Sequence, residues 1–355
     1  MIKYIGSKRR LVPQILRLVQ AIPRAHTVLD LFTGTTRVAQ GLKRAGYFVT
    51  ANDLASYSEL LATTYIATDA AAVDELALAG MIAELNALPG QRGYFTRTFC
   101  EEARYLQPQN GMRVDAIRAR IEAMQVNAGT RAILLTALLE AADRVDSTTG
   151  IQMAYLKQWS ARSHSPLTLR VPQLIEGPGR AMRADAREAI RGVDTYDVAY
   201  LDPPYNQHSY YRNYHVWETL VRGDEPSTYG IARKRADART TRSAFNLRGE
   251  AWQALREVVL GLRARHVVLS FSDEGFFTVE AIRDLLAERC GEVAALAVPS
   301  ARYVGAKIGI HDLKGVLVGE VGHLTNTEWL FVGGPDAAGI VRRATENGRA
   351  DSEVA

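Results

Sequence analysis

The stretch TVLDLFTGTTRV, residues 27–38, decides the fold that we expect for this chain. Its first half is an apolar run that ends at Asp30, which predicts a buried β-strand. Gly34 then permits a tight turn, and the apolar side chains of Val38 and Leu42 recur at the spacing of a helix face. A strand, a glycine turn and a helix in this order form the first unit of a nucleotide-binding α/β sheet.

A carboxylate ends each of the first two expected strands. Asp30 ends the first strand, where its carboxylate suits a cationic group of a bound ligand. The second strand, residues 47–51, delivers Asp53 about 20 residues after the glycine turn, where ribose hydroxyls are bound in such folds. A dinucleotide-binding loop carries three glycines, whereas this turn has only Gly34, which weighs against NAD as the ligand.

A later stretch, VAYLDPPY at residues 198–205, carries the chemistry. Its apolar run predicts another buried strand, and two prolines end that strand on a rigid, non-helical turn. Ligands bind at the carboxyl ends of strands in open α/β sheets. There Asp202 and the Pro203 carbonyl suit the two N–H groups of a planar base, and Tyr205 suits its face. An ordinary strand exit is the alternative for a bare Asp-Pro pair.

The full tetrapeptide Asp-Pro-Pro-Tyr resembles the signature of amino-methyltransferases that use S-adenosylmethionine (SAM), specifically the DNA adenine-N6 methyltransferases. The order along the chain, with the SAM half first, is similar to the alpha-ordered, D12-type group. The resemblance covers residues 3–53 and 185–272. It implies an α/β fold with a Rossmann-like SAM-dependent methyltransferase sheet and an inserted helical subdomain. It also implies SAM as cofactor and site-specific methyl transfer to N6 of an adenine flipped out of double-stranded DNA.

The same resemblance implies the site residues. Tyr4, Gly6, Ser7 and Lys8 are similar to an N-terminal block whose aromatic ring and lysine contact SAM. From the residues alone, this block equally predicts a basic surface arm, with Ser7 as a helix cap. The implied cofactor-binding residues are Tyr4, Gly6, Lys8, Asp30, Gly34, Asp53 and Asp185, the last for the adenine of SAM, and the implied catalytic residues are Asp202, Pro203, Pro204 and Tyr205. Thr36 departs from the family, where a second glycine is common.

The middle of the chain changes character. From about residue 70 to 142, alanine, leucine and spaced charges predict amphipathic helices in place of further βα alternation. The aromatic and basic side chains between residues 92 and 105 fit a helix core better than a DNA surface. We therefore expect four parts: 1–69, the SAM-binding half; 70–165, the helical insert and connector; 166–334, the catalytic half; and 335–355, a disordered tail.

Two segments after the Asp-Pro-Pro-Tyr motif have compositions that suit DNA. Rings mixed with amides at residues 206–215 suit stacking on exposed bases, although a loop packed on the sheet is an equal alternative. The run 222–248 is rich in Arg and Lys; a solvated loop is its default interpretation, and phosphate contacts beside a base pocket are the functional one. The candidate DNA-binding residues are Tyr210, Tyr211, Arg233, Lys234, Arg235, Arg239 and Arg242.

Composition sets broad limits. The 355 residues are 23% charged and 47% apolar, with a net charge of +4, which is typical of a soluble globular protein and permits a nucleic-acid partner without requiring one. Cys100 and Cys290 lie far apart, so neither a disulfide framework nor a metal site is indicated. A reducing cytoplasm fits this cysteine usage. No signal peptide or apolar run of membrane-spanning length is expected, and hence no membrane partner.

Other reactions on the same fold stay open at this point. Cytosine-N4 methylation, usually with Ser at the position of Asp202, is the first alternative. Methylation of RNA or protein follows, and a catalytically degenerate DNA-binding protein would fit the threonine at position 36. Cytosine-C5 methylation is disfavoured because neither cysteine stands in a Pro-Cys motif. A partner restriction endonuclease is a possibility, whereas the recognition sequence and the oligomeric state are not fixed by the sequence.

Overall fold

The computed structural model is an α/β protein. It describes residues 2–6, 8–192, 194–273, 275–301, 310–311, 317–319 and 325–354. Ser7, the predicted helix cap, lies outside these residues. The chain divides into two compact units: unit 1 comprises Met1–Arg9, Asp30–Ala189 and His208–Ser243, and unit 2 comprises Arg10–Leu29, Ile190–Gln207 and Ala244–Ala355.

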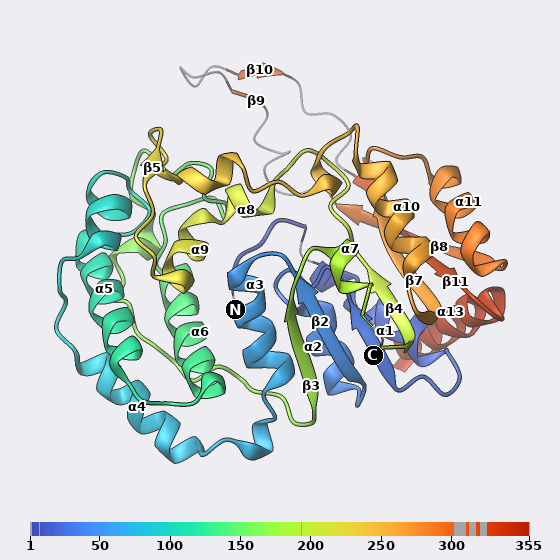
Figure 1. The fold of residues 1–355 in the computed structure, drawn as a ribbon, viewed down its shortest axis with the longest axis horizontal. Helices are drawn as coiled ribbons and strands as arrows, with labels where there is room; N and C mark the ends of the chain where they lie inside the picture. Colours follow the sequence, from blue (N-terminus) through green and yellow to red (C-terminus); the bar gives the residue numbers. More distant parts are fainter. Residues whose placement is uncertain are drawn as a thin grey trace. The chain divides into compact units, whose positions relative to one another are not determined.

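A seven-stranded sheet has the order β3-β2-β1-β4-β7-β11-β8. Strand β2 pairs with β3 in parallel and β4 pairs with β7 in parallel, whereas β11 runs antiparallel to both β7 and β8. The strands are β1 (Thr27–Asp30), β2 (Phe48–Asp53), β3 (Gly179–Arg183), β4 (Tyr196–Leu201), β7 (Ala264–Ser272), β8 (Val293–Ala301) and β11 (Thr325–Gly333). This mostly parallel sheet with helices confirms the predicted Rossmann-like α/β class (Figure 1).

Two further pairs of short strands lie apart from this sheet. Strands β5 (Thr228–Tyr229) and β6 (Lys234–Arg235) form an antiparallel hairpin in unit 1. Strands β9 (Ile310–His311) and β10 (Leu317–Gly319) form another antiparallel pair in unit 2. The β5–β6 hairpin gives regular structure to part of the basic run, for which a solvated loop is the default expectation.

The sheet strands form where the sequence has apolar runs. Residues 198–201 of β4 and 267–269 of β7 are buried, as are residues 49–52 of β2. A parallel strand with both faces covered by helices needs such a continuous apolar run in place of alternation. For this reason the strands around 27–30, 47–51 and 196–201 are predictable from the sequence alone.

Unit 1 holds most of the helices, and capping side chains mark several of their starts. The Asp74 carboxylate accepts from Ala77 N at 2.9 Å and the side-chain Oδ1 of Asn127 accepts from Thr130 N at 2.8 Å, which satisfies N–H groups at the starts of α4 and α6. The helices are α2 (Arg37–Arg44), α3 (Ser56–Ala62), α4 (Glu75–Ala87), α5 (Pro108–Ala123), α6 (Ala128–Arg144), α7 (Ala186–Ala189), α8 (Tyr210–Asn213) and α9 (His215–Arg222), with 3₁₀ segments η3 (Ala70–Ala72), η5 (Ala161–His164) and η6 (Ala236–Arg239) and π segments η2 (Thr63–Ala67) and η4 (Thr96–Glu101); η1 (Lys8–Arg10) lies at the unit boundary.

The predicted helical segment is a layer of packed helices. Helix α4 packs on α5, and α5 packs on α6, as Figure 1 shows in cyan and green. Helix α6 is the most deeply buried of them: Leu134, Leu135 and Leu138 have no exposed surface, and the Thr136 hydroxyl pairs with that of Thr64 at 2.8 Å. Because α6 packs against α3 and η2, the segment is part of unit 1 and does not form a unit of its own.

Unit 2 contains the remaining helices and corrects one prediction. Its helices are α1 (Val12–Gln20), α10 (Ala251–Gly261), α11 (Val279–Cys290) and α13 (Ala337–Val354), with the 3₁₀ segment η7 (Ala244–Asn246). The prediction of a disordered tail over 335–355 is wrong for α13. Ala337, Ile340 and Ala344 are buried at helical spacing, and α13 packs against α1 and β8, so the small apolar residues suffice to hold the helix. None of the described helices has the length and apolarity that a membrane span requires.

A buried histidine in unit 1 predicts acid sensitivity. His215 has no exposed surface, its Nε2 lies 3.0 Å from the Gln152 carbonyl oxygen, and burial lowers the pKa of its imidazole to about 3. Below pH 6.5 the unfolded chain takes up a proton at this residue while the folded chain does not. The free energy of unfolding should therefore fall by up to about 1.4 kcal/mol per pH unit between pH 6.5 and 3.

Urea unfolding of the wild type and of His215→Gln at pH 7 and pH 5 measures this contribution. The stability loss between the two pH values should be smaller in His215→Gln, because glutamine takes up no proton. Equal losses in both proteins would exclude His215 as the source of acid sensitivity.

Candidate active site

The turn after β1 holds an aromatic ring against its glycine. Gly34 has a φ of +51°, and a Cβ atom built on it would lie 3.3 Å from Cε1 of Tyr4. Any larger residue would have both an unfavourable backbone conformation and a contact with the ring. The N-terminal block therefore contacts the glycine turn within unit 1. From the sequence, only the family resemblance places these two segments together.

The Tyr4 ring belongs to a stack of tyrosines. Its centroid lies 4.6 Å from that of Tyr214 and 5.2 Å from that of Tyr210, and both pairs are near parallel. Tyr57 meets the Tyr4 ring edge-on at 6.4 Å. Burial raises the pKa of Tyr4 and Tyr57 well above the ordinary value, so both stay neutral phenols. Tyr210, predicted for DNA, thus lies beside Tyr4, predicted for the cofactor; its contact with DNA stays a prediction.

Gly6 shapes the same stack. It has a φ of +73°, and a Cβ there would lie 2.9 Å from the Tyr210 hydroxyl oxygen. The Tyr214 hydroxyl accepts from Ile5 N at 2.7 Å, which ties the N-terminal segment to the start of α9. Tyr57 is a site residue that sequence reasoning missed, whereas Tyr214 lies in the ring-rich segment 206–215. Aromatic composition alone gives no signal for Tyr57, because its partners Tyr4 and Tyr214 lie in distant segments of the chain.

Asp53, at the end of β2, has its carboxylate oriented by backbone hydrogen bonds. Asp53 Oδ2 accepts from Gly34 N at 2.9 Å and Oδ1 accepts from Ala55 N at 3.1 Å. Burial raises the pKa of this carboxyl above its usual value, and these backbone N–H groups oppose the shift. Each carboxylate oxygen can accept a second bond. A half-buried acceptor fixed beside the glycine turn fits the ribose hydroxyls of SAM, and the residues present therefore suit this cofactor.

The rest of the turn is held by internal bonds. Thr33 Oγ1 donates to Asp30 Oδ2 at 2.9 Å, and Asp30 is buried. Thr36 adopts a left-handed conformation with a φ of +60°, which is uncommon for a β-branched residue and explains why glycine is favoured there. Its hydroxyl donates to Thr35 O at 2.7 Å and accepts from Gln40 Nε2 at 2.8 Å. These bonds let a threonine occupy the position without loss of the turn.

The ends of β2 and β3 are joined by Asn52, a second residue that sequence reasoning missed. Its side-chain amide donates to the carbonyls of Leu31 at 3.1 Å and Ala184 at 3.2 Å, and its oxygen accepts from Ala184 N at 3.1 Å. Asp185 follows directly, and its Oδ1 accepts from Arg187 N and Nε, both at 3.0 Å. The predicted role of Asp185 toward the adenine of SAM stays a prediction.

Ionic contacts anchor the N-terminal segment. Lys3 Nζ lies 3.1 Å from Asp143 Oδ2 and 2.9 Å from Asp146 Oδ1, and both carboxylates are nearly fully buried. Burial raises the pKa of Asp143 to about 6, against the opposing effect of Lys3. The sequence leaves open whether the connector after α6 is ordered. In the structure the start of this connector is buried and anchors the N-terminal segment. Lys8, predicted to contact SAM, is also buried.

In unit 2 the Asp-Pro-Pro-Tyr motif follows β4 directly. Asp202 and Tyr205 are half-buried and Pro203 is buried, all beyond the last residue of the strand. The turn is fixed by two bonds: the Tyr205 carbonyl accepts from Phe276 N at 2.9 Å, and the Asn206 carbonyl accepts from Asn246 Nδ2 at 2.9 Å. The Tyr205 ring meets Phe271 edge-on at 5.8 Å. The predicted strand and its end before Asp202 are confirmed, and the rigidity of the turn stays a prediction.

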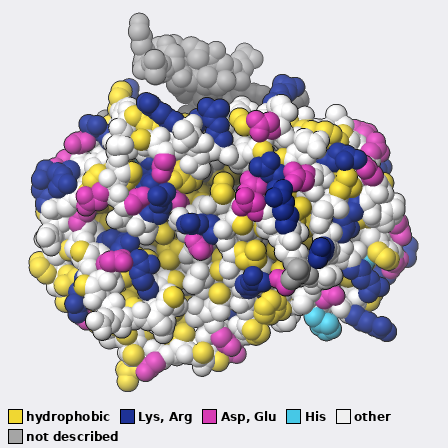
Figure 2. Space-filling view, viewed as in Figure 1, with side chains coloured by type: hydrophobic (Ala, Val, Ile, Leu, Met, Phe, Trp, Pro, Cys, Tyr) yellow, Lys and Arg dark blue, Asp and Glu magenta, His cyan; other side chains and the backbone are white. Residues whose placement is uncertain are grey.

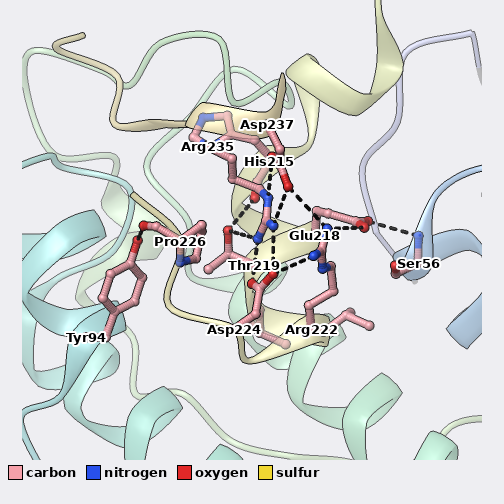
Figure 3. Close-up of polar contacts among 12 residues, drawn as sticks. Ser56, Tyr94, His215, Glu218, Thr219, Arg222, Asp224, Pro226, Arg235 and Asp237 are labelled. Carbon is pink, nitrogen blue, oxygen red and sulfur yellow. Dashed lines mark hydrogen bonds and ion pairs between the residues drawn. The ribbon is translucent and has the colours of Figure 1, made fainter. Parts of the chain in front are cut away.

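The basic run of unit 1 corrects the prediction for Arg235. Its side chain is 1% exposed and lies between two carboxylates: Nη1 donates to Asp224 Oδ1 at 2.7 Å and Nη2 donates to Asp237 Oδ2 at 2.8 Å (Figure 3). Burial lowers the pKa of Arg235, but the hydrogen bonds to Asp224 and Asp237 raise it above the ordinary value overall. The guanidinium of Arg235 therefore forms structural ion pairs and is not available to a phosphate.

The other predicted DNA-binding residues have more access to solvent. Arg239 and Arg242 are exposed, and Arg239 lies 4.0 Å above the Tyr229 ring. Arg233 and Lys234 are half-buried, and Arg233 Nε lies 3.2 Å from Glu102 Oε2. Tyr211, also half-buried, donates its hydroxyl to Asp237 Oδ2 at 3.2 Å. Over the face seen in Figure 2, the basic side chains of the described residues are interspersed with acidic ones, so any phosphate contact must be local.

Comparison with known proteins agrees with the motifs and geometry of both units. The family model for D12 class N6 adenine-specific DNA methyltransferases matches residues 4–284, and the chain belongs to this family. Modification methylase StsI of Streptococcus sanguinis is 30% identical over 81% of this chain and 46% of its own length. Type II methyltransferase M.NlaIII of Neisseria lactamica is 28% identical over 86% and 93% respectively, and M.FokI of Planomicrobium okeanokoites is 29% identical over 80% and 46%. The matched region thus spans about half the length of two of these relatives.

Proposed function

We propose that this chain transfers a methyl group from SAM to N6 of adenine at a specific sequence in double-stranded DNA. The observation that carries the proposal is the Asp-Pro-Pro-Tyr turn fixed at the carboxyl end of β4, with Asp202 half-buried, in a chain of the N6-adenine family. The cytosine-N4 alternative gains no support from this family, and neither does a degenerate DNA-binding protein. The three relatives named above are modification methylases or type II methyltransferases.

The cofactor-binding roles fall on unit 1. Asp53 would accept the ribose hydroxyls, Asp30 would face the cationic amino group, and the Tyr4 ring beside Gly34 would offer an apolar wall. When bound, SAM supplies a methyl group already activated on a positively charged sulfur, so no covalent intermediate on the protein is required. The neutral phenols of Tyr4 and Tyr57 suit a site for a positively charged ligand because they add aromatic faces without charge.

The base-binding roles fall on the motif after β4. The amino nitrogen of adenine is a poor nucleophile because its lone pair is delocalised into the ring. Accepting one N–H at Asp202 and the other at the Pro203 carbonyl favours a pyramidal nitrogen with a localised lone pair. Two consecutive prolines keep these acceptors from rotating away, which holds the orientation before reaction. Stacking of Tyr205 on the base would complete the grip.

The target atom lies inside the duplex stack, so the adenine must leave it. Unpairing and unstacking a base costs a few kcal/mol. Contacts of Tyr205 with the extruded base and of exposed cations with the phosphates would offset this cost. Sequence information must come from other side chains, since phosphate contacts carry none.

Transfer of a tritium-labelled methyl group to duplex DNA, followed by nucleoside analysis, tests the proposed reaction. We expect the label in N6-methyldeoxyadenosine, at positions that methylated-base mapping assigns to one recognition sequence. Label in N4-methyldeoxycytidine, or transfer to RNA in place of DNA, would reject the proposal. SAM binding by calorimetry without any transfer would indicate a protein that has kept only the cofactor site.

The exposed arginines of the basic run predict a salt-dependent affinity. Arg239→Gln combined with Arg242→Gln should weaken DNA binding and lower the slope of log K against log salt by about 2, one for each lost phosphate contact. Arg120→Gln on α5, an exposed arginine outside this run, is the matched control and should leave the slope unchanged. Titrations at several salt concentrations measure both. An unchanged slope in the double variant would identify the run as a solvated surface.

We also propose a cytoplasmic location and a separate restriction endonuclease as partner. Two free cysteines, Cys100 and Cys290, suit a reducing compartment. The relatives' names describe a modification methylase and type II methyltransferases. Cleavage of unmethylated but not of methylated host DNA by a lysate would support such a partner.

A further inference from the structure

The hairpin β5–β6 presents an apolar side chain to solvent at its tip. Ile231 is 84% exposed and stands in the four-residue connection between Tyr229 and Lys234. Among the described residues, only Ile231 and Leu76 combine a large apolar side chain with more than half of their surface exposed. Single exposed apolar residues are common, so exposure alone is no evidence of function. The surroundings of Ile231 supply the rest of the evidence.

The tip is held rigidly from below. The hydroxyl of Tyr105, a residue with no exposed surface, lies 2.9 Å from the carbonyl oxygen of Ala232, directly beside Ile231, and 2.8 Å from that of Gln152, so its one proton is shared between the two acceptors. At the base of the hairpin Ala236 N donates to Ser227 O at 2.8 Å, and the Tyr94 hydroxyl donates to Pro226 O. The Arg235 ion pairs with Asp224 and Asp237 lock the second strand (Figure 3). These contacts hold the hairpin in one conformation. A side chain that separates stacked bases requires such a fixed support, whereas a solvated loop does not.

The charge around the tip fits a nucleic acid. Arg233 and Lys234 follow Ile231 after Ala232, and Arg233 is paired with Glu102 at 3.2 Å. The exposed Arg239 lies over the ring of Tyr229, on the strand that leads to the tip. Burial lowers the pKa of Lys234, and the nearby Arg212 makes a smaller contribution in the same direction. Phosphates would neutralise this charge, and a stiff β-branched side chain at its centre would then face the bases.

We propose that Ile231 is a wedge that enters the base stack of double-stranded DNA beside the target adenine and helps to unstack it. Minor-groove and architectural proteins use apolar side chains, isoleucine among them, in this way to separate base steps. The cations beside it hold the backbone while the side chain fills the space between the bases. This proposal rests on the proposed function, because a protein without DNA as substrate has no stack to open.

The substitution Ile231→Ala, assayed by methyl transfer to duplexes that carry the mapped recognition sequence, tests this role. We expect kcat/KM to fall about 10- to 100-fold on a fully paired duplex. On a duplex with a mismatch opposite the target adenine, the loss should shrink to about threefold or less, since a mismatched base is already easier to extrude. Ile231→Leu should keep most of the activity because it keeps the apolar volume.

Leu76→Ala on α4 is the matched control, because Leu76 is 85% exposed and lies in the same unit but outside the hairpin. It should equal the wild type on both duplexes. Ile231→Ala activity at the Leu76→Ala level would overturn the proposal, and so would an equal loss on paired and mismatched DNA. A wild-type protein that methylates no DNA would overturn the proposed function and this inference together, and the wild-type reaction therefore separates the two failures.

Discussion

Replacing Asp202 by alanine is expected to lower the turnover of methyl transfer by about 10²–10³-fold while SAM affinity stays the same. The alanine removes an acceptor that polarises the amino group only as the nitrogen becomes nucleophilic, so the loss should appear in kcat more than in KM for DNA. The cofactor-binding candidates Asp53 and Tyr4 belong to unit 1, whereas Asp202 belongs to unit 2. Single-turnover kinetics with labelled SAM, together with calorimetry of SAM binding, would measure both quantities.

The fold should survive this change. Asp202 is half-buried and lies beyond the last residue of β4, so alanine leaves no core cavity. A surface substitution of this kind changes the free energy of unfolding by about 0.5 kcal/mol or less. Asp202→Asn keeps one acceptor oxygen but places an N–H₂ group beside the amine, and its activity should lie between those of the alanine variant and the wild type.

A control on the neighbouring strand separates a catalytic carboxylate from any acid at a strand end. Asp273 directly follows β7, which pairs in parallel with β4, and it is exposed. Asp273→Ala should turn over at nearly the wild-type rate. Near-normal turnover of Asp202→Ala would rule out the role assigned to this carboxylate, and an equal loss in both variants would point to a general effect on this edge of the sheet.

Local chemistry explains why the motif after β4 is predictable from the sequence. An apolar run specifies a buried strand, and two prolines end it whatever the rest of the chain does. The contact of Tyr4 with Gly34 is less local, and composition alone leaves the N-terminal block as a surface arm. The sequence of helix α13 contains a weak helix pattern. Ala337, Ile340 and Ala344 recur at helical spacing within a segment whose composition otherwise suggests disorder.

Tertiary partners decide the features that sequence reasoning missed. The tyrosine stack joins residues 4, 57, 210 and 214, which no local pattern relates. Charge composition assigns every cation of the run 222–248 the same character, yet Arg235 is buried and Arg239 is exposed. Arg235 is buried because it pairs with Asp224 and Asp237 of the same run and contacts Thr219 on α9. Burial of a charge is therefore the property least accessible from sequence.

Arg235 yields the prediction with the largest expected effect on stability. Its guanidinium donates to both oxygens of Asp224, at 2.7 and 2.8 Å, to both oxygens of Asp237, at 3.1 and 2.8 Å, and to Thr219 Oγ1 at 3.1 Å. Removing one partner of a buried ion pair costs about 3–5 kcal/mol, because the remaining charge is left uncompensated. Asp224 and Asp237 are 29% and 36% exposed, so water screens part of this penalty. We expect Arg235→Met to lower the free energy of unfolding by about 3 kcal/mol, at the lower end of that range.

The neighbouring Arg222 provides a matched control, because it contacts the same two carboxylates from a more exposed position. Its Nη2 lies 2.7 Å from Asp224 Oδ2 and its Nη1 lies 3.3 Å from Asp237 Oδ2, with the side chain 38% exposed. An exposed pair contributes about 0–1 kcal/mol, so Arg222→Met should change the urea midpoint little. Arg235→Lys should recover only part of the loss, since an ammonium group cannot form the two-pronged contact that a guanidinium makes.

The ion pairs of Arg235 belong to a wider set of polar contacts around the β5–β6 hairpin. Glu218 accepts from Ser56 N at 3.0 Å and lies on the same face of α9 as Arg222, so the residues around Arg235 extend to the start of α3 (Figure 3). Loss of Arg235 should therefore loosen the β5–β6 hairpin first and raise its susceptibility to limited proteolysis before the rest of unit 1 unfolds. If Arg235→Met and Arg222→Met unfolded at the same urea concentration, and if proteolysis of the hairpin stayed at the wild-type rate, the buried pair would have no role in stability. A phosphate-binding role for Arg235 predicts the opposite pattern: intact stability and a reduced salt slope of DNA binding.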